Sequence, residues 1–304
     1  MNTALELLEK VSNGDMLALA RAISLVENES EGYQDILNAL RFDRLVPVTG
    51  ITGPPGAGKS TLINALANHL SNAGKKVGIL AVDPTSPFSR GALLGDRVRM
   101  GDQFRNPNIF IRSIATRGSL GGLSAKTLEI TDLMKQAGFD HILIETVGVG
   151  QSEVEIASLA DTTVLVLVPG AGDEVQALKS GIMEIADLFV VNKADREGAD
   201  AYVRHIQEML GLRSVNSHLP VLKTAAHTAS GISELADAID AHYAALVPST
   251  KLHLLAEKAY RLIREQRMKD LHIEELEQAL LEKSKSGDFN IYRFASERAS
   301  NKKE

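Results

Sequence analysis

The chain has 304 residues, 44% of them hydrophobic, which is enough to bury a full α/β core with small appendages. Its formal net charge of −6 argues against nonspecific nucleic-acid binding. It has no cysteine, which excludes disulfides and thiolate metal sites, and its eight histidines show no ligand spacing. The N-terminus has no signal or transit pattern, and no apolar run approaches the roughly 20 residues that span a bilayer. We therefore expect a soluble, cytoplasmic protein without membrane contact.

Residues 1–45 carry apolar residues at helical spacing and predict an N-terminal helical extension. Strand-like and helix-like segments then alternate through 46–247, which is typical of a mostly parallel central sheet flanked by helices. The predicted strands are 46–52, 76–82, 108–114, 140–146, 162–168, 187–192 and 219–225. The charged remainder, 248–304, has a helical period and predicts a C-terminal helical segment.

The first predicted strand leads into an unbroken G-x-x-x-x-G-K-S sequence, the signature of a phosphate-binding loop. The residues concerned are Gly53, Pro54, Pro55, Gly56, Ala57, Gly58, Lys59 and Ser60, and Thr61 opens the helix that follows. Glycines let successive backbone N–H groups surround a phosphate, and the N-terminus of the helix faces the same anion. We expect Lys59 to bridge the β- and γ-phosphates and the Ser60 hydroxyl to bind Mg²⁺. The strand before the loop and the helix after it predict a P-loop NTPase fold.

Acidic residues follow the predicted strands nearest the loop. Asp83 ends the second strand, in the crevice where α/β sheets bind ligands, although an Asp before a proline also starts turns. Asp96 and Arg99 lie in a glycine-rich segment. There, Asp96 can approach the metal and Arg99 the phosphates. The same residues fit a solvated charged turn equally well.

Glu145-Thr146-Val147-Gly148 ends the fourth predicted strand, where GTPases usually carry D-x-x-G. In that motif the acid reaches Mg²⁺ through water, and the N–H of the glycine, here Gly148, meets the γ-phosphate. Val149 stands where Ras-like enzymes keep a glutamine that orients water. Because valine cannot orient water, we expect slow intrinsic hydrolysis unless a partner or another loop completes the site.

Asn192-Lys193-Ala194-Asp195 closes the sixth predicted strand and resembles the guanine-specificity motif N-K-x-D. A carboxylate accepts hydrogen bonds from both the ring N1–H and the exocyclic amine of guanine, whereas adenine lacks that pair of donors. Ala225 and Ala226 end the next strand, where a GTPase places a backbone N–H against the guanine O6. The sequence therefore predicts GTP and GDP as ligands.

The order of these motifs resembles the MeaB/ArgK family of GTPases over about residues 1–250. The matching segments read G-P-P-G-A-G-K-S-T, A-V-D-P-T-S-P, L-G-D-R-V-R-M, G-G-L-S, E-T-V-G-V-G-Q-S-E, G-A-G-D-E-V-Q-A-L-K-S-G-I-M-E-I-A-D and V-N-K-A-D. The family comprises G-protein chaperones of adenosylcobalamin-dependent acyl-CoA mutases, chiefly methylmalonyl-CoA mutase. The resemblance implies that Lys59 and Ser60 bind phosphate and Mg²⁺, that Asp83, Asp96 and Glu145 surround the metal, and that Asp195 reads guanine.

The resemblance also implies moving parts and partners. Segments 83–100 and 145–158 match the switch loops of the family, and 169–181 matches a mobile loop that relays the nucleotide state to the mutase. The residues of that last segment fit an ordinary loop equally well. The corresponding C-terminal region makes the family's homodimer, and the shortness of 248–304 leaves the mode of dimerisation open.

The function that these patterns predict is a slow GTPase switch that gates adenosylcobalamin loading and protection of a mutase. Lys59, Glu145, Asp83 and Arg99 are its predicted catalytic residues. Three alternatives are a nickel-insertion GTPase, an ATP-dependent kinase linked to amino-acid transport, and a scaffold whose nucleotide is structural. The lack of cysteine disfavours the nickel-insertion GTPase, and Asp195 disfavours the ATP-dependent kinase. Turnover measurements would distinguish the scaffold from the GTPase switch.

Overall fold

The structure is a computed structural model. It describes residues 3–41, 45–83, 106–115, 125–146, 155–170, 181–211, 219–268, 271, 273–284 and 289–300. The chain divides into two compact units, Met1–Lys258 and Ala259–Glu304.

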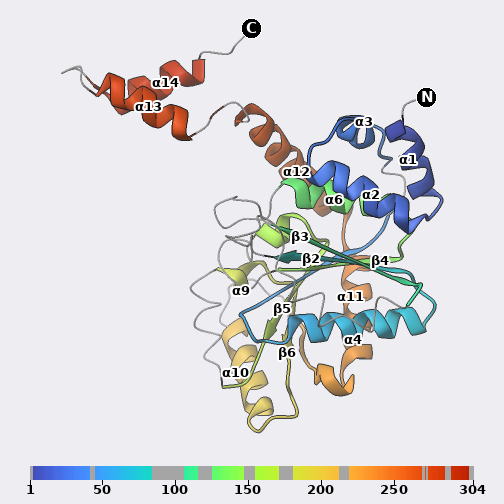
Figure 1. The fold of residues 1–304 in the computed structure, drawn as a ribbon. Coiled ribbons are helices and arrows are strands. Elements are labelled where there is room, and N and C mark those ends of the chain that lie inside the picture. The colour runs from blue at the N-terminus through green and yellow to red at the C-terminus, as the bar shows by residue number, and fades with distance from the viewer. Residues whose placement is uncertain are drawn as a thin grey trace. The chain divides into compact units, whose positions relative to one another are not determined.

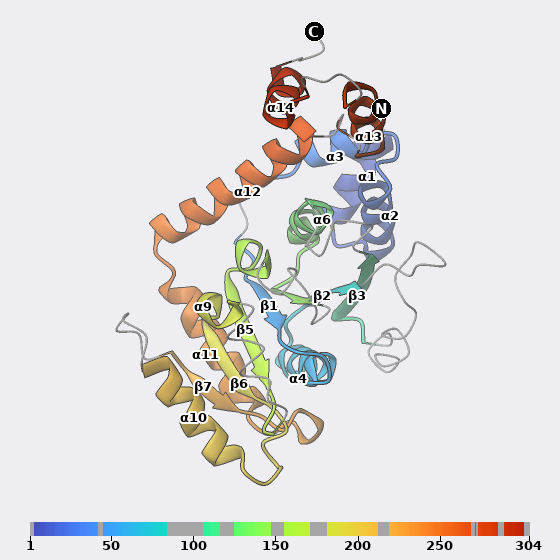
Figure 2. The ribbon, with the colours of Figure 1, turned by 90° about the vertical axis from the view of Figure 1, so that its left-hand side faces the viewer.

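A parallel sheet of seven strands forms the centre of the first unit (Figure 2). Its strands are β1 (Val48–Thr52), β2 (Val77–Asp83), β3 (Ile109–Ala115), β4 (His141–Glu145), β5 (Thr162–Leu167), β6 (Leu188–Val191) and β7 (Val221–Lys223). Their order is β3-β2-β4-β1-β5-β6-β7, and every pairing is parallel. All residues of β1, β4, β5 and β6 are buried, as expected for strands covered on both faces. The predicted strands and the predicted fold class are confirmed.

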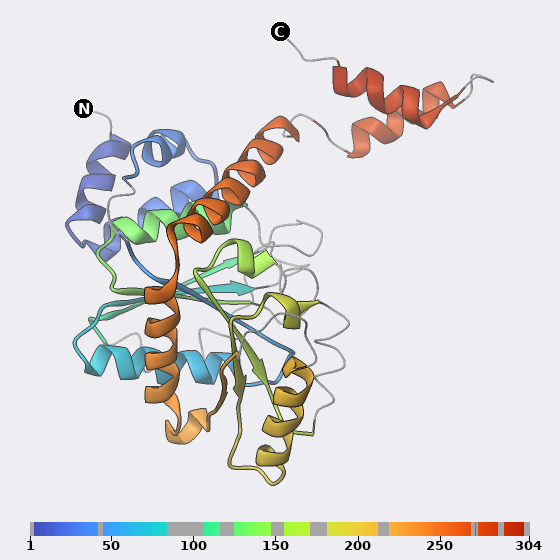
Figure 3. The same ribbon diagram turned by 180° about the vertical axis from the view of Figure 1, so that it is seen from behind.

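Helices cover both faces of the sheet (Figures 1 and 3). One face packs against α4 (Lys59–Asn72) and α11 (Ile232–Ala245). The other face packs against α6 (Ala125–Gln136) and the N-terminal helices, and further along the sheet against α9 (Ile182–Ile185) and α10 (Ala199–Gly211). Successive strand residues alternate between the two cores: Ile79 belongs to the first and Leu80 to the second.

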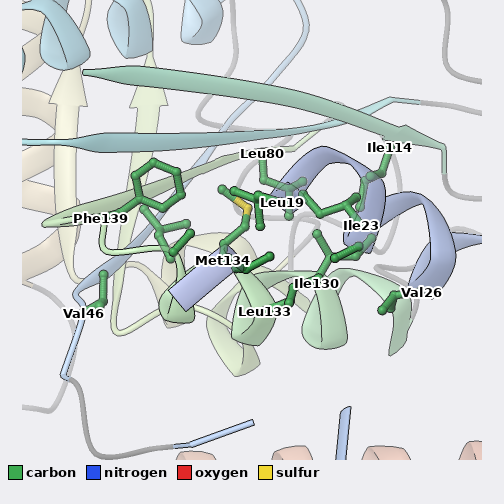
Figure 4. Close-up of a cluster of buried hydrophobic side chains, with 14 of the residues drawn as sticks. Leu19, Ile23, Val26, Val46, Leu80, Ile114, Ile130, Leu133, Met134 and Phe139 are labelled. Carbon is green, nitrogen blue, oxygen red and sulfur yellow. The ribbon is translucent and has the colours of Figure 1, made fainter. Parts of the chain in front are cut away.

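The predicted N-terminal helices are α1 (Thr3–Ser12), α2 (Met16–Glu27) and α3 (Tyr33–Asn38). Asp15 caps α2 because its carboxylate accepts hydrogen bonds from the backbone N–H groups of Leu17 and Ala18, at 2.9 and 3.0 Å. Leu19 and Ile23 of α2 pack among the apolar side chains of α6 and the sheet (Figure 4). These helices are therefore part of the main core.

The C-terminal block is helical, as the sequence predicts: α12 (Pro248–Met268), α13 (Ile273–Lys283) and α14 (Ile291–Ser300). Within the first unit, Lys258 of α12 forms an ion pair with Asp132 of α6. Within the second unit, Lys283 pairs with Glu297 and lies over the ring of Phe294, at 5.6 Å from its centroid. Among the described helices, we find none with both the length and the hydropathy of a membrane-spanning segment.

Candidate functional site: a nucleotide crevice at the carboxyl edge of the sheet

The predicted phosphate-binding loop joins the central strand β1 to α4, with its turns set by glycine. Gly53 and Gly58 have φ values of 140° and 88°, which L-residues rarely adopt. A Cβ at Gly53 would lie 2.2 Å from the carbonyl oxygen of Val166, and one at Gly58 would lie 2.6 Å from Nδ2 of Asn192. Glycine is therefore needed at both positions for the loop to lie against β5 and the guanine-side motif.

The side chain of Lys59 folds back into this loop. Its Nζ donates hydrogen bonds to the carbonyl oxygens of Gly53 and Pro54, at 2.7 and 3.1 Å, and the residue is only 6% exposed. The ammonium group thus lies inside the ring of backbone that a phosphate would enter. From this position it can exchange carbonyl partners for phosphate oxygens, which are stronger partners because they are charged.

Ser60 and Glu145 meet beside the loop. The Ser60 hydroxyl donates a hydrogen bond to Oε1 of Glu145, at 2.6 Å, across 85 residues of sequence. Glu145 ends β4 and lies opposite Ile51 of β1, so strand pairing brings the two side chains together. A hydroxyl and a carboxylate this close are hard oxygen ligands of the kind that Mg²⁺ prefers. The donor set fits the predicted metal. Among the described residues, no three or more histidine, aspartate or glutamate side chains gather into a group that could hold a metal ion.

Other predicted residues of the metal and γ-phosphate region are placed only in part. Asp83 is the last residue of β2, whose Ala81 lies opposite Glu145, so its backbone reaches the same edge of the sheet. Its side chain lies outside the described part of the structure. Asp96, Arg99 and Gly148 lie outside the described residues altogether.

Asn192 connects the guanine-side motif to the phosphate loop. Its Nδ2 donates a hydrogen bond to the carbonyl oxygen of Ala57, at 2.9 Å. Its Oδ1 accepts from the hydroxyl of Thr224, at 3.1 Å, and from the N–H of Ala226, at 3.3 Å. Lys193, at a positive φ of 57°, donates from Nζ to the carbonyl oxygen of Gly56, at 2.7 Å. The first two residues of the N-K-x-D motif therefore hold the loop in place from the side.

Asp195 and the alanine pair lie at the ends of β6 and β7. The N–H of Ala225 donates to the carbonyl oxygen of Ser230, at 3.0 Å, and that of Ala226 to Asn192. The Asp195 side chain is 48% exposed, and its Oδ1 lies 4.0 Å from Nδ1 of His227. Its carboxylate is thus open to a ligand with two donors. No local pattern in the sequence points to His227.

The groups with shifted pKa values in the sheet lie at its opposite, amino edge. Burial lowers the pKa of His141, the first residue of β4, although the nearby Asp240 carboxylate opposes this effect. Burial raises the pKa of Asp187, which precedes β6, although a hydrogen bond from the N–H of Thr163 opposes it. These groups belong to the packing of α11 and the strand starts, and take no part in the crevice.

The fold and this site define a P-loop nucleotide-binding protein with a guanine-side motif, and comparisons with known proteins agree. The family model described as methylmalonyl Co-A mutase-associated GTPase MeaB matches residues 19–285. A putative GTPase of Pyrococcus abyssi is 49% identical over 258 residues, covering 81% of this chain and 78% of that protein. The mouse protein named methylmalonic aciduria type A homolog, mitochondrial, is 39% identical over 246 residues, covering 74% of this chain and 59% of its own length.

Among solved structures, the crystal structure of an LAO/AO transport system kinase superposes with a TM-score of 0.72. It shares 26% sequence identity, and the match covers 98% of this chain and 96% of that one. The chain therefore belongs to the MeaB family of GTPases. It is an enzyme that binds guanine nucleotides and hydrolyses GTP.

Proposed function

We propose that this GTPase is the chaperone of an adenosylcobalamin-dependent acyl-CoA mutase of the methylmalonyl-CoA mutase type. In this role GTP binding and hydrolysis gate the loading of the cofactor into the mutase and protect the loaded enzyme. The observation that carries the proposal is the match of residues 19–285 to a family described as associated with methylmalonyl-CoA mutase. The name of the mouse relative, which refers to methylmalonic aciduria, supports the same partner.

In this proposal different residues of the crevice bind the phosphates, the metal ion and the γ-phosphate. The backbone of the loop and Lys59 bind the phosphates, and Ser60 and Glu145 hold Mg²⁺, with Asp83 and Asp96 completing its surroundings. Mg²⁺ when bound neutralises charge on the β- and γ-phosphate oxygens. Arg99 and Gly148 act on the γ-phosphate, within switch segments 83–100 and 145–158.

Asp195 supplies the choice of base, and this part is tested by calorimetry. We expect GDP to bind far more tightly than ADP, since hydrogen bonds from the neutral base to a charged carboxylate contribute about 2–3 kcal/mol, or on the order of 30- to 150-fold in affinity. Asp195→Asn should move the preference toward xanthosine diphosphate, whose 2-oxo group replaces the amine donor. Equal binding of ADP and GDP by the wild type would remove this assignment.

The mutase role is tested by measuring GTP hydrolysis with and without an adenosylcobalamin-dependent mutase from the same cell. We expect stimulation of a slow intrinsic rate, below the ~1 s⁻¹ low end of ordinary enzymes. Asp173→Lys and Lys179→Glu, in the proposed relay segment outside the described residues, should blunt the stimulation and leave the intrinsic rate nearly intact. Glu208→Lys, an exposed charge reversal on α10, is the matched control. No binding and no stimulation in any nucleotide state would refute the chaperone role.

We also infer a cytoplasmic homodimer that assembles through 248–304. Apolar side chains are exposed on these helices, among them Ile273, Leu281 and Tyr292, at 62, 64 and 81%. Where exposed apolar side chains lie together, they mark protein interaction surfaces. Light scattering of the full chain tests this inference: a monomer mass at micromolar concentration, with and without GDP, would contradict it.

A further inference from the structure

A pair of buried threonines joins the start of the phosphate-binding loop to the strand end that carries Glu145. Thr52 is the last residue of β1, and Thr146 directly follows the end of β4. The hydroxyl of Thr146 donates a hydrogen bond to Oγ1 of Thr52, at 3.1 Å, across 94 residues of sequence. Thr52 is 0% and Thr146 1% exposed, so the pair lies where water is scarce. The two residues meet because β1 pairs with β4 in a register that sets Ile51 opposite Glu145.

On the side of Thr52, the hydrogen bond starts from a fixed point. Gly53, the next residue, lies so close to β5 that a Cβ would be 2.2 Å from the carbonyl oxygen of Val166. The carbonyl oxygen of Gly53 also accepts a hydrogen bond from Nζ of Lys59, at 2.7 Å. Thr52 is therefore held between the central strand and the phosphate-binding loop and has little room to move.

On the side of Thr146, the hydrogen bond ends one peptide away from Glu145. The N–H of Thr146 donates to the carbonyl oxygen of Ile51, at 3.2 Å, which continues the pairing of β1 with β4. Because successive Cα atoms are a fixed distance of about 3.8 Å apart across a planar trans peptide, a shift of Thr146 displaces Glu145 as well. Glu145 in turn accepts a hydrogen bond from Ser60, at 2.6 Å. The threonine pair and the Ser60–Glu145 contact therefore span the same gap between the ends of the two strands.

We propose that Thr52 and Thr146 are positioning residues of the metal site, which hold Glu145 at the distance from Ser60 that Mg²⁺ requires. The proposal rests on the proposed roles of Ser60 and Glu145. Mg²⁺ tolerates little error, since it demands near-octahedral geometry with ligands at about 2.0–2.1 Å. Two hydroxyl oxygens lie 3.1 Å apart here, whereas two methyl carbons in the same places stay about 3.5–4.0 Å apart. Methyl groups at these places therefore widen the gap and leave both metal ligands in the chain.

The test uses the full chain and the β,γ-imido analogue of GTP, whose dissociation constant is measured by calorimetry in Mg²⁺ and in EDTA. The ratio of the two constants reports the contribution of the metal. Thr52→Val and Thr146→Val keep the shape of the side chain and lose the hydroxyl, whereas Thr146→Ser keeps the hydroxyl. Thr131→Val is the matched control, because Thr131 is also 1% exposed and its hydroxyl bonds to the carbonyl oxygen of Thr127 within α6. Glu145→Gln tests the metal ligand itself.

In Mg²⁺ we expect each valine variant of the pair to bind the analogue about tenfold more weakly than the wild type, the low end of the loss when a group that orients a metal ligand is removed. In EDTA the same variants should bind like the wild type, because the loop backbone and Lys59 are unchanged. Thr146→Ser should keep the wild-type ratio, although the loss of a buried methyl group lowers its melting temperature. Thr131→Val should keep the wild-type ratio too.

The double variant Thr52→Val with Thr146→Val keeps the test open if a single variant does not fold. It leaves no buried hydroxyl without a partner, so its melting temperature should exceed that of either single variant. The wider gap remains, so the weaker binding in Mg²⁺ should remain as well.

A wild-type ratio in the valine variants, with a lowered ratio in Glu145→Gln, would overturn the role of the threonine pair alone, and only the melting temperature would then report the pair. A ratio in Thr146→Ser as low as that in Thr146→Val would also overturn it, because the hydroxyl would then not be the group that acts. A wild-type ratio in Glu145→Gln would instead overturn the assignment of Glu145 to the metal, and the inference about the threonine pair with it.

Discussion

Replacing Asn192 by alanine tests whether one buried amide holds the phosphate loop against the guanine side of the crevice. Asn192 is 2% exposed and joins three partners from two segments: the carbonyl oxygen of Ala57, the hydroxyl of Thr224 and the N–H of Ala226. Alanine removes all three hydrogen bonds. Ala57, Thr224 and Ala226 are themselves 1, 1 and 7% exposed, so their polar groups would lose the partner where water is scarce.

The magnitude follows from these three groups. Each buried polar group without a partner costs about 1–3 kcal/mol, which sums to about 3–9 kcal/mol. Water entering the vacated volume from the adjoining loop satisfies part of this loss, so we expect a decrease of about 3 kcal/mol in the free energy of unfolding. Against a typical total of about 5–15 kcal/mol, this is a large fraction. GDP affinity should fall as well, because the loop loses a support for its phosphate-binding conformation.

Urea unfolding of the nucleotide-free chain, followed by circular dichroism, measures the first effect; the chain has no tryptophan to report by fluorescence. Thr224→Val, which removes one of the three bonds, should cost about 1 kcal/mol. Asn28→Ala, at the exposed C-cap of α2, is the control and should have little effect. A change below about 0.5 kcal/mol for Asn192→Ala, within the range of ordinary surface substitutions, together with unaltered GDP affinity, would refute the reasoning.

Three further outcomes are expected. Gly58→Ala should destabilise the chain, because its Cβ would meet Asn192 and its φ of 88° strains an L-residue by roughly 1–2 kcal/mol. In the Asn192→Ala background, Gly58→Ala should cost less stability, because the contact is gone. Strictly additive losses of stability would argue against this contact. Lys59→Ala should abolish GTP hydrolysis while the circular dichroism spectrum stays native, and retained turnover would exclude Lys59 from the chemistry. Because burial lowers the folded-state pKa of His141, its contribution to stability is present above the unfolded pKa of about 6.5 and is lost as pH falls below it. His141→Gln should therefore flatten the loss of stability below pH 6.5, as measured by urea unfolding at several pH values, and an unchanged slope would contradict the assignment.

The sequence alone was sufficient for the kinds of element, their order along the chain and the phosphate loop. Each of these is a local property. Alternation of strand-like and helix-like segments marks a parallel α/β sheet, and the spacing of glycines before Lys59 marks a turn that opens a helix. The helical character of the N- and C-terminal blocks was equally readable from the spacing of apolar residues.

The tertiary structure decided which of these local features meet. The strand order places β4 and β5 on either side of β1, and this places Glu145 against Ser60 across 85 residues. It also brings Asn192 to Ala57 across 135 residues. The N-K-x-D motif, which the sequence predicts to bind the guanine base, therefore also supports the phosphate loop. His227 becomes a neighbour of Asp195 only because β6 and β7 pair. Periodicity and turn signals act within a few residues, whereas hydrogen bonds between distant side chains depend on strand order and register, which no local pattern encodes.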